Sequence, residues 1–135
     1  MATLIDTNVL IDIAVRDPVW LKWSRSQVVD ARKRGSVVIN QVIYAEFSIR
    51  YSTMDEVNDA IPEEEFRRES LPFEAAYAAS RAFAFYRRQG GMRDKVLPDF
   101  LIGAHAAVRG YSILTRDPAG FRAYFPGVDL IAPTA

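Results

Sequence analysis

Four carboxylates lie in apolar parts of the sequence, where an ionised side chain is costly unless it is paired or binds a cation. Asp6 directly follows the apolar run 2–5, and Asp117 comes shortly after the apolar run 112–114. Glu46 falls in the middle of the apolar face when residues 41–50 are drawn as a helix. Asp99 stands at the start of the strongly apolar segment 98–109. An all-oxygen set without His or Cys suits Mg²⁺ or Mn²⁺ rather than zinc.

Each of these acids also has a structural explanation. Asp6 and Asp99 could stabilise the N-terminus of a helix, and Asp117 could cap a helix together with Pro118. Glu46 could reach solvent from a slightly rotated helix, or pair with an arginine. The four together are more informative, because Asp6 and Asp117 would converge if their strands were parallel. Four carboxylates in one cleft repel one another, and divalent cations remove that conflict.

The elements that would position these acids alternate along the chain. Strand candidates are residues 2–5, 37–39, 66–71, 112–114 and 128–131. Between them lie helical patterns, the clearest running from Phe73 to just before Gly90. This alternation predicts an α/β fold with a mainly parallel sheet. His105 stands on the helix predicted over 98–109; its direction points away from Asp99, so a packed histidine is favoured over a catalytic base.

Composition narrows the class of protein. The 135 residues predict a single domain over 1–135, and a half-apolar composition excludes a disordered chain. The absence of cysteine excludes disulfides and thiolate zinc sites, and a single histidine excludes a His-rich site. No window approaches 18 apolar residues, and the N-terminus has no basic leader. We therefore expect a soluble, cytoplasmic protein without a membrane segment.

Net charge is zero, with 17 basic and 17 acidic side chains, whereas most nucleic-acid-binding proteins are basic. Without the four acids above, the basic side chains exceed the remaining acidic ones by four. A surface of that charge is compatible with an RNA substrate. The candidate phosphate contacts are Arg93, Lys95 and Arg116, together with Arg81, Arg87 and Arg88. Each of these taken singly is better explained as solvated surface.

Several short segments carry a family resemblance: residues 5–10, 40–46, 97–106 and 114–118, with the tail 124–133. With these motifs in this order, and spacings of 40, 53 and 18 residues between the acids, the chain resembles PIN-domain nucleases, and in particular VapC-type toxins of toxin–antitoxin pairs. The resemblance covers residues 4–133. It implies a three-layer α/β/α fold whose mainly parallel sheet has about five short strands.

The resemblance also implies an activity. It is that of an endoribonuclease that hydrolyses RNA phosphodiester bonds with Mg²⁺ or Mn²⁺. The catalytic, metal-binding positions of the family are matched by Asp6, Glu46, Asp99 and Asp117, called here the acidic quartet. Thr115 matches a hydroxyl position beside the site, and Asn8 a polar neighbour of the first acid. Proteins of this type form homodimers and are inhibited by a cognate antitoxin. We therefore expect a homodimer and an antitoxin partner here.

Two other interpretations stay open. The chain could be a PIN-fold binding or regulatory module that docks a partner without cleaving RNA. It could also be another phosphoryl-transfer protein with an acidic pocket. A haloacid-dehalogenase-type phosphatase would carry an aspartate at position 8, where this chain has Asn8, and a receiver-type switch would need adjacent acids before Asp6. Glycine patterns of P-loop and dinucleotide-binding proteins are absent from the sequence.

Overall fold

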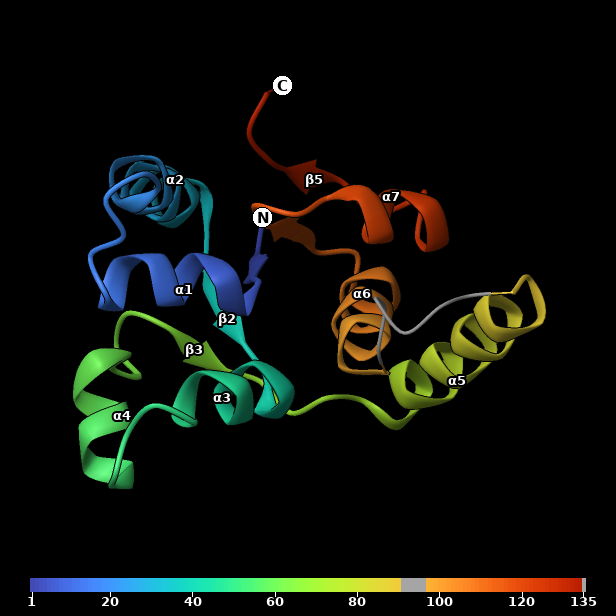
Figure 1. Ribbon diagram of the computed structural model, residues 1–135, viewed down its shortest axis with the longest axis horizontal. Helices are drawn as coiled ribbons and strands as arrows, with labels where there is room; N and C mark the ends of the chain where they lie inside the picture. Colours follow the sequence, from blue (N-terminus) through green and yellow to red (C-terminus); the bar gives the residue numbers. More distant parts are fainter. Residues whose placement is uncertain (91–96, 135) are drawn as a thin grey trace.

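In the computed structural model, which describes residues 1–90 and 97–134, five short strands form one parallel sheet. The central strand β1 (Thr3–Ile5) pairs with β2 (Val37–Ile39) on one side and with β4 (Ser112–Leu114) on the other. The outer strands are β3 (Arg67–Arg68) and β5 (Leu130–Ile131), which gives the order β3-β2-β1-β4-β5 (Figure 1). Since each neighbouring pair is parallel, the carboxyl ends of the strands meet at one edge.

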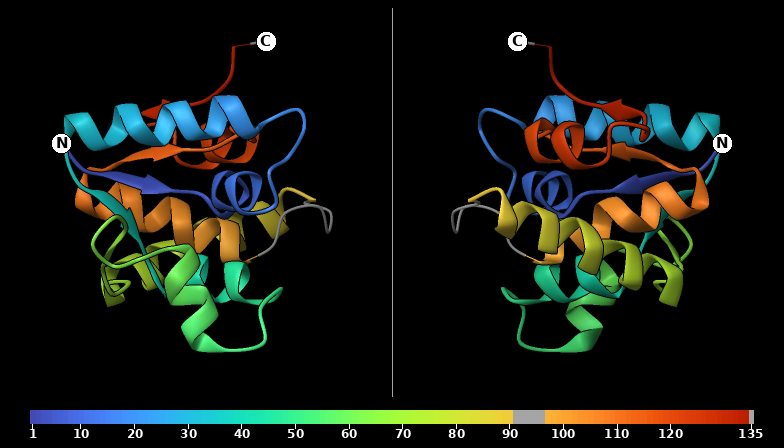
Figure 2. Two further views of the ribbon diagram at one scale, coloured as in Figure 1. Left: turned by 90° about the vertical axis from the view of Figure 1, so that its left-hand side faces the viewer. Right: turned by 90° about the vertical axis from the view of Figure 1, so that its right-hand side faces the viewer.

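Helices cover both faces of this sheet. Within the described ranges they are α1 (Thr7–Ala14), α2 (Leu21–Arg34), α3 (Gln41–Ser48), α4 (Met54–Ala60), α5 (Phe73–Arg88), α6 (Leu97–Arg109) and α7 (Ala119–Tyr124). Helices α2 and α7 lie on one face, and α3 to α6 lie on the other (Figure 2). The predicted three-layer α/β/α fold with a mainly parallel sheet of about five short strands is therefore confirmed. No helix in the described ranges has the length and apolar character needed to cross a membrane.

The central strands are short and fully buried because helices pack on both of their faces. Leu4 and Ile5 of β1 share one core with Val28 of α2 and Ile102 of α6. A second cluster joins α5 to α6, where the small residue Ala79 and its neighbours let the two helices approach closely. This second cluster also contains Phe100, whose ring reaches the aromatic residues around α7.

The turn from β2 into α3 depends on one side chain. Asn40 ends the strand with an extended backbone, and its Oδ1 accepts a hydrogen bond from the Ile43 backbone N–H at 3.0 Å. This is the N-cap geometry that asparagine favours, and it satisfies a donor that the helix would otherwise leave open. The cap fixes where α3 begins, and so fixes the direction in which Glu46 leaves that helix.

Candidate active site

Asp6 lies at the carboxyl end of β1 and is 8% exposed. Its Oδ1 accepts from the Thr7 backbone N–H at 2.8 Å, so it caps α1 as one of its two explanations predicted. Its Oδ2 accepts from Thr115 Oγ1 at 2.7 Å, across the β1–β4 boundary. Thr115 Oγ1 also accepts from the Asp117 backbone N–H at 3.0 Å. The hydroxyl therefore joins the first and last acids of the quartet.

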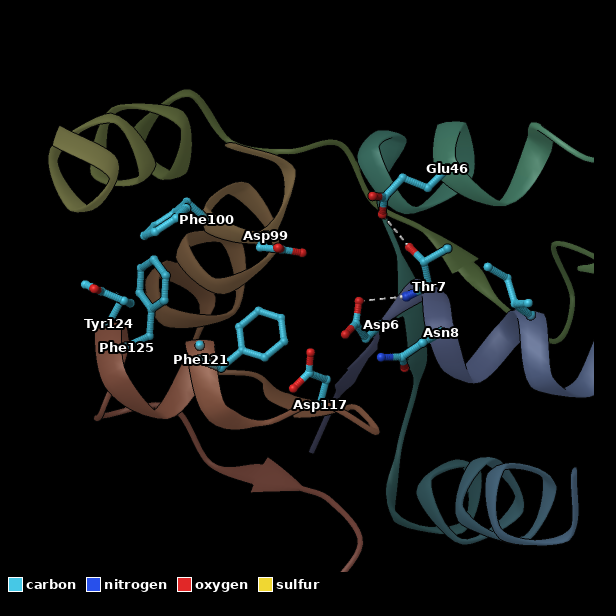
Figure 3. A pocket seen from close by; sticks show the side chains of 12 residues that line it. Asp6, Thr7, Asn8, Glu46, Asp99, Phe100, Asp117, Phe121, Tyr124 and Phe125 are labelled. Carbon is cyan, nitrogen blue, oxygen red and sulfur yellow. Dashed lines mark hydrogen bonds between the residues drawn. The ribbon is translucent and has the colours of Figure 1, made fainter. Parts of the chain in front are cut away.

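Glu46 leaves α3 toward the same region and is half-buried. Thr7 Oγ1 donates to Glu46 Oε1 at 2.7 Å, which ties α3 to the first residue of α1 (Figure 3). Among the described residues, no lysine or arginine forms an ion pair with Glu46. The alternative in which an arginine pairs with Glu46 is therefore not seen among these residues. The Glu46 carboxylate faces the other acids instead.

Asp99 and Asp117 come from the second half of the chain. Asp99 lies in the first turn of α6, where a negative charge is favourable, so that structural explanation also holds. Asp117 is exposed and precedes α7, whose N-cap is Pro118 and has no side-chain cap hydrogen bond. The explanation of Asp117 as a helix cap is therefore wrong, and its carboxylate is directed into the shared space (Figure 3).

All four acids of the quartet line one cavity of about 280 Å³. One side of this cavity is polar, with Thr7 and Asn8 beside the acids. The other side is apolar, with the rings of Phe100, Phe121, Tyr124 and Phe125 (Figure 3). Ile11 of α1 and Gly120 of α7 complete the lining. The cavity lies next to the β1–β4 boundary, where the strand order reverses direction, which is the usual ligand position in open parallel sheets.

The electrostatics of the cavity centre on Asp6. Burial raises the pKa of Asp6 to about 6; hydrogen bonds from Thr115 and Thr7 oppose this rise, and the negative charges of Asp99 and Glu46 add to it. The carboxylates of Asp6, Asp99 and Glu46 therefore repel one another in this cavity. A donor set made only of carboxylate oxygens fits Mg²⁺ or Mn²⁺. In this arrangement, no three His, Cys, Asp or Glu side chains of the described residues already converge on one metal position.

The two accessory residues predicted from sequence lie beside the quartet. Thr115 is fully buried and hydrogen-bonded to Asp6, as described above. Asn8 Nδ2 donates to Thr115 Oγ1 at 3.5 Å, and Asn8 Oδ1 accepts from the Arg116 backbone N–H at 3.3 Å. Asn8 thus holds the loop that carries Asp117 against α1.

Arg116 was predicted as a phosphate contact, and its guanidinium has a partner in the protein. Arg116 Nε forms an ion pair with Asp12 Oδ2 at 2.6 Å, and the guanidinium lies 5.1 Å from the Trp20 ring centre. Asp12 is 1% exposed and also accepts from Ser24 Oγ at 2.7 Å. Sequence reasoning missed Asp12, although a carboxylate within an apolar helix was the signal that identified Glu46. A contact between Arg116 and phosphate stays a prediction.

Among the described residues, none of the other cationic candidates lines the cavity. Arg93 and Lys95 lie outside the described residues. Arg81, Arg87 and Arg88 are exposed on α5, and each guanidinium lies over an aromatic ring of that helix. His105 is fully buried and does not line the cavity, in agreement with the packed histidine favoured from the sequence.

The fold is similar to solved structures of toxin–antitoxin complexes. These include VapBC2 from Rickettsia felis bound to a DNA fragment of its promoter (TM-score 0.78, 14% identity, 99% of this chain and 100% of that chain covered). They also include VapBC-1 from nontypeable Haemophilus influenzae (TM-score 0.72, 15% identity, 98% of each chain). A third is DNA-bound VapBC from Salmonella typhimurium (TM-score 0.69, 20% identity, 98% of each chain). At these identities the likeness is one of fold.

A family model assigns the sequence to a protein family, which the likeness of fold alone does not do. The sequence matches no curated protein. Residues 3–125, which include all four acids of the quartet, match the model of the PIN domain. This protein therefore belongs to the PIN domain family.

Proposed function

We propose that this protein is a Mg²⁺- or Mn²⁺-dependent endoribonuclease that acts as the toxin of a toxin–antitoxin pair. The observation that carries the proposal is the gathering of four carboxylates, from four separate segments of the chain, in one cavity. Membership of the PIN domain family supports a nuclease, and the likeness to VapBC complexes supports the role of toxin.

In this proposal each residue of the polar side has a defined task. Two donors, the Thr7 backbone N–H and the Thr115 hydroxyl, hold the Asp6 carboxylate in place. The Thr7 hydroxyl holds Glu46. Asp99 of α6 and Asp117, which precedes α7, complete the set of oxygen ligands. When bound by these carboxylates, divalent cations lower the pKa of an attacking water and stabilise the leaving oxygen of the phosphodiester.

The apolar side of the cavity supports a nucleic acid as the substrate. Its aromatic rings provide the kind of surface on which a base of single-stranded RNA stacks beside the scissile phosphate. Gly103 of α6 packs directly against the Phe125 ring, and a side chain at position 103 would collide with it. The close packing of α6 on α7 therefore keeps the apolar side of the cavity next to Asp99.

A toxin of this type needs a partner that controls it. We propose that a cognate antitoxin covers the cavity and places a cationic group among the quartet. Burial is the main cause of the raised pKa of Asp6, and such a group would relieve the repulsion from Asp99 and Glu46 that adds to it. We also propose that the protein forms a homodimer, by analogy with the family that its sequence resembles.

The experiment that tests the proposal is cleavage of total RNA by antitoxin-free protein with Mg²⁺ or Mn²⁺. The controls are EDTA and the Asp99→Asn variant, with circular dichroism to establish that the variant is folded. We expect cuts that both controls abolish. Binding of Mn²⁺ without any cut, across transfer, ribosomal and messenger RNA, would contradict the nuclease and favour a PIN-fold binding module.

A further inference from the structure

A second cluster of polar side chains lies between α3 and α6, away from the cavity. His105 of α6 is fully buried; its Nδ1 lies 2.9 Å from Asn40 Nδ2, and its Nε2 lies 2.8 Å from Glu69 Oε2. Tyr111 donates its hydroxyl to Glu69 Oε1 at 2.6 Å. Arg67 and Arg109 form ion pairs with the same carboxylate at 3.2 and 3.4 Å. These six residues are called the Glu69 network below.

The hydrogen bonds of Asn40 determine which nitrogen of His105 carries the proton. Asn40 Oδ1 accepts from the Ile43 backbone N–H, so the amide group of Asn40 must turn its N–H bonds toward His105. His105 Nδ1 is therefore the acceptor, and Nε2–H is the donor to the Glu69 carboxylate. In the series of hydrogen bonds from Ile43 through Asn40 and His105 to Glu69, each bond has a single possible donor. The series can therefore form with only one arrangement of protons.

The network joins the elements that carry the acids of the quartet. Asn40 caps α3 six residues before Glu46, and His105 lies six residues after Asp99 on α6. At 1.5 Å per residue, each lies about 9 Å along its helix from the acid. Tyr111 comes directly before β4, which leads to Thr115. The Glu69 backbone N–H donates to the Ile39 carbonyl at 3.0 Å, which anchors the network to β2.

We propose that His105 is a positioning residue: by holding the Asn40 cap, it sets the separation between Glu46 on α3 and Asp99 on α6. The proposal rests on the function proposed above. Neither Asn40 nor His105 lines the cavity, so the effect passes through the two helices. A displacement of about 1 Å between reacting groups can cost on the order of 100-fold in rate, so a modest loosening is measurable.

The first test separates two roles of Asn40, the capping of α3 and the contact with His105. Serine caps a helix about as well as asparagine but is too short to reach His105, so Asn40→Ser keeps α3 and breaks the contact to α6. We expect kcat to fall roughly 10- to 100-fold and the Kd for Mn²⁺ alone to rise roughly tenfold. The KM for RNA should stay within about twofold, because no contact to substrate is removed.

The matched control is Thr53→Ala. Thr53 caps α4 through a capping box with Glu56, and α4 carries no acid of the quartet. Its loss should lower Tm more than Asn40→Ser does, while kcat and the Kd for Mn²⁺ stay at wild-type values. A loss of kcat in Thr53→Ala equal to that in Asn40→Ser would reduce the network to general stability, and so would overturn the proposal.

The second test uses two replacements of His105. The amide of asparagine occupies the position of Nδ1, and that of glutamine the position of Nε2. His105→Asn can thus keep the bond to Asn40, whereas His105→Gln can keep only the bond to Glu69. The proposal predicts higher kcat and tighter Mn²⁺ binding in His105→Asn, even where the two variants have equal Tm. The opposite order would overturn it.

Nuclear magnetic resonance gives a readout that does not depend on activity, because His105 is the only histidine. The ¹⁵N shifts should report a protonated Nε2 and an unprotonated Nδ1 in wild type, and a loss of the Nδ1 hydrogen bond in Asn40→Ser. Wild-type protein that neither binds Mn²⁺ nor cuts RNA overturns the proposed function, and this inference with it. Wild-type protein that does both, with Asn40→Ser unchanged, overturns this inference alone.

Discussion

Asp6 and Glu69 are two carboxylates at the same edge of one sheet, and their surroundings act on them in opposite ways. Asp6 follows β1, and burial, with the charges of Asp99 and Glu46, raises its pKa to about 6 despite two hydrogen bonds. Glu69 follows β3, where burial also acts to raise the pKa. There, hydrogen bonds from Tyr111 and His105, together with the positive charge of Arg67, outweigh burial, and the pKa of Glu69 lies below its usual value.

The difference teaches how to tell a structural acid from a candidate ligand. Glu69 receives donors and cations from the chain itself, so its negative charge is already compensated. Asp6 faces other acids, so the charge of the cavity is compensated best by a cation from solution. Both residues are acids near strand ends, and only their neighbours distinguish them.

The largest expected effect is on RNA cleavage. Asp6→Asn should reduce kcat by roughly 1,000-fold or more, since a metal ion contributes several kcal/mol to stabilising the transition state. Glu69→Gln should keep cleavage within about tenfold of wild type, because glutamine still accepts a hydrogen bond from His105 Nε2. Single-turnover cleavage of one mapped substrate compares the two. Similar losses in both variants would remove the distinction drawn here.

The second effect is on the pH dependence of stability without metal. The pKa of Asp6 is raised on folding, so its contribution is fully present below its ordinary pKa and is lost as pH rises through about 6. Asp6→Asn should therefore be more stable than wild type at pH 7.5, by up to about 3 kcal/mol, and nearly equal to it near pH 4. Urea unfolding in EDTA measures this. A constant difference across that range would contradict the assigned cause.

Glu69 should have the opposite pH dependence, with a smaller effect. Its pKa is lowered, so it stabilises the fold above its ordinary pKa, and this contribution is lost as pH falls through the folded value. Glu69→Gln should lower the free energy of unfolding at pH 7 by roughly 1–2 kcal/mol, since both arginine partners are half exposed and partly screened. Urea midpoints at pH 7 and pH 3.5 would show whether the cost disappears in acid.

The smallest effect tests the hydroxyl that holds Asp6. Thr115→Val keeps the shape of a fully buried side chain and removes the donor to Asp6 Oδ2. We expect roughly a tenfold loss of kcat and a further rise in the pKa of Asp6, because that hydrogen bond opposes the effect of burial. Thr115→Ser, which keeps the hydroxyl, should restore the rate. Equal rates in the valine and serine variants would assign Thr115 to packing alone.

Most of what could be predicted about the fold came from local patterns in the sequence. The strands at 37–39 and 112–114 are short segments rich in Val, Ile and Leu, and the structure has both with these bounds. The weak alternation over 66–71 shortens to Arg67–Arg68, a two-residue edge strand. The strand order could not be worked out from the residues, because pairing depends on segments far apart in the chain.

The candidate site was predictable to the extent that each residue carried its own signal. Glu46 conflicts with its own helix face, and that conflict is visible in one window of sequence. Arg116 shows the limit, because its partner Asp12 lies 104 residues away and an arginine next to an acidic site looks like a phosphate contact. The link from His105 to Glu69 has the same character. Metal binding by the quartet stays a prediction.

The sheet order has a practical consequence. Residues 1–70 supply the adjacent strands β3, β2 and β1 with two of the acids, and residues 71–134 supply β4 and β5 with the other two. The two halves of the sequence meet between β1 and β4, beside the cavity. A chain divided after the exposed Ser70 would give two fragments, neither of which holds the whole quartet. Fused to two other proteins, such fragments would be a split form of the proposed nuclease, whose cleavage of RNA would report that those proteins have met.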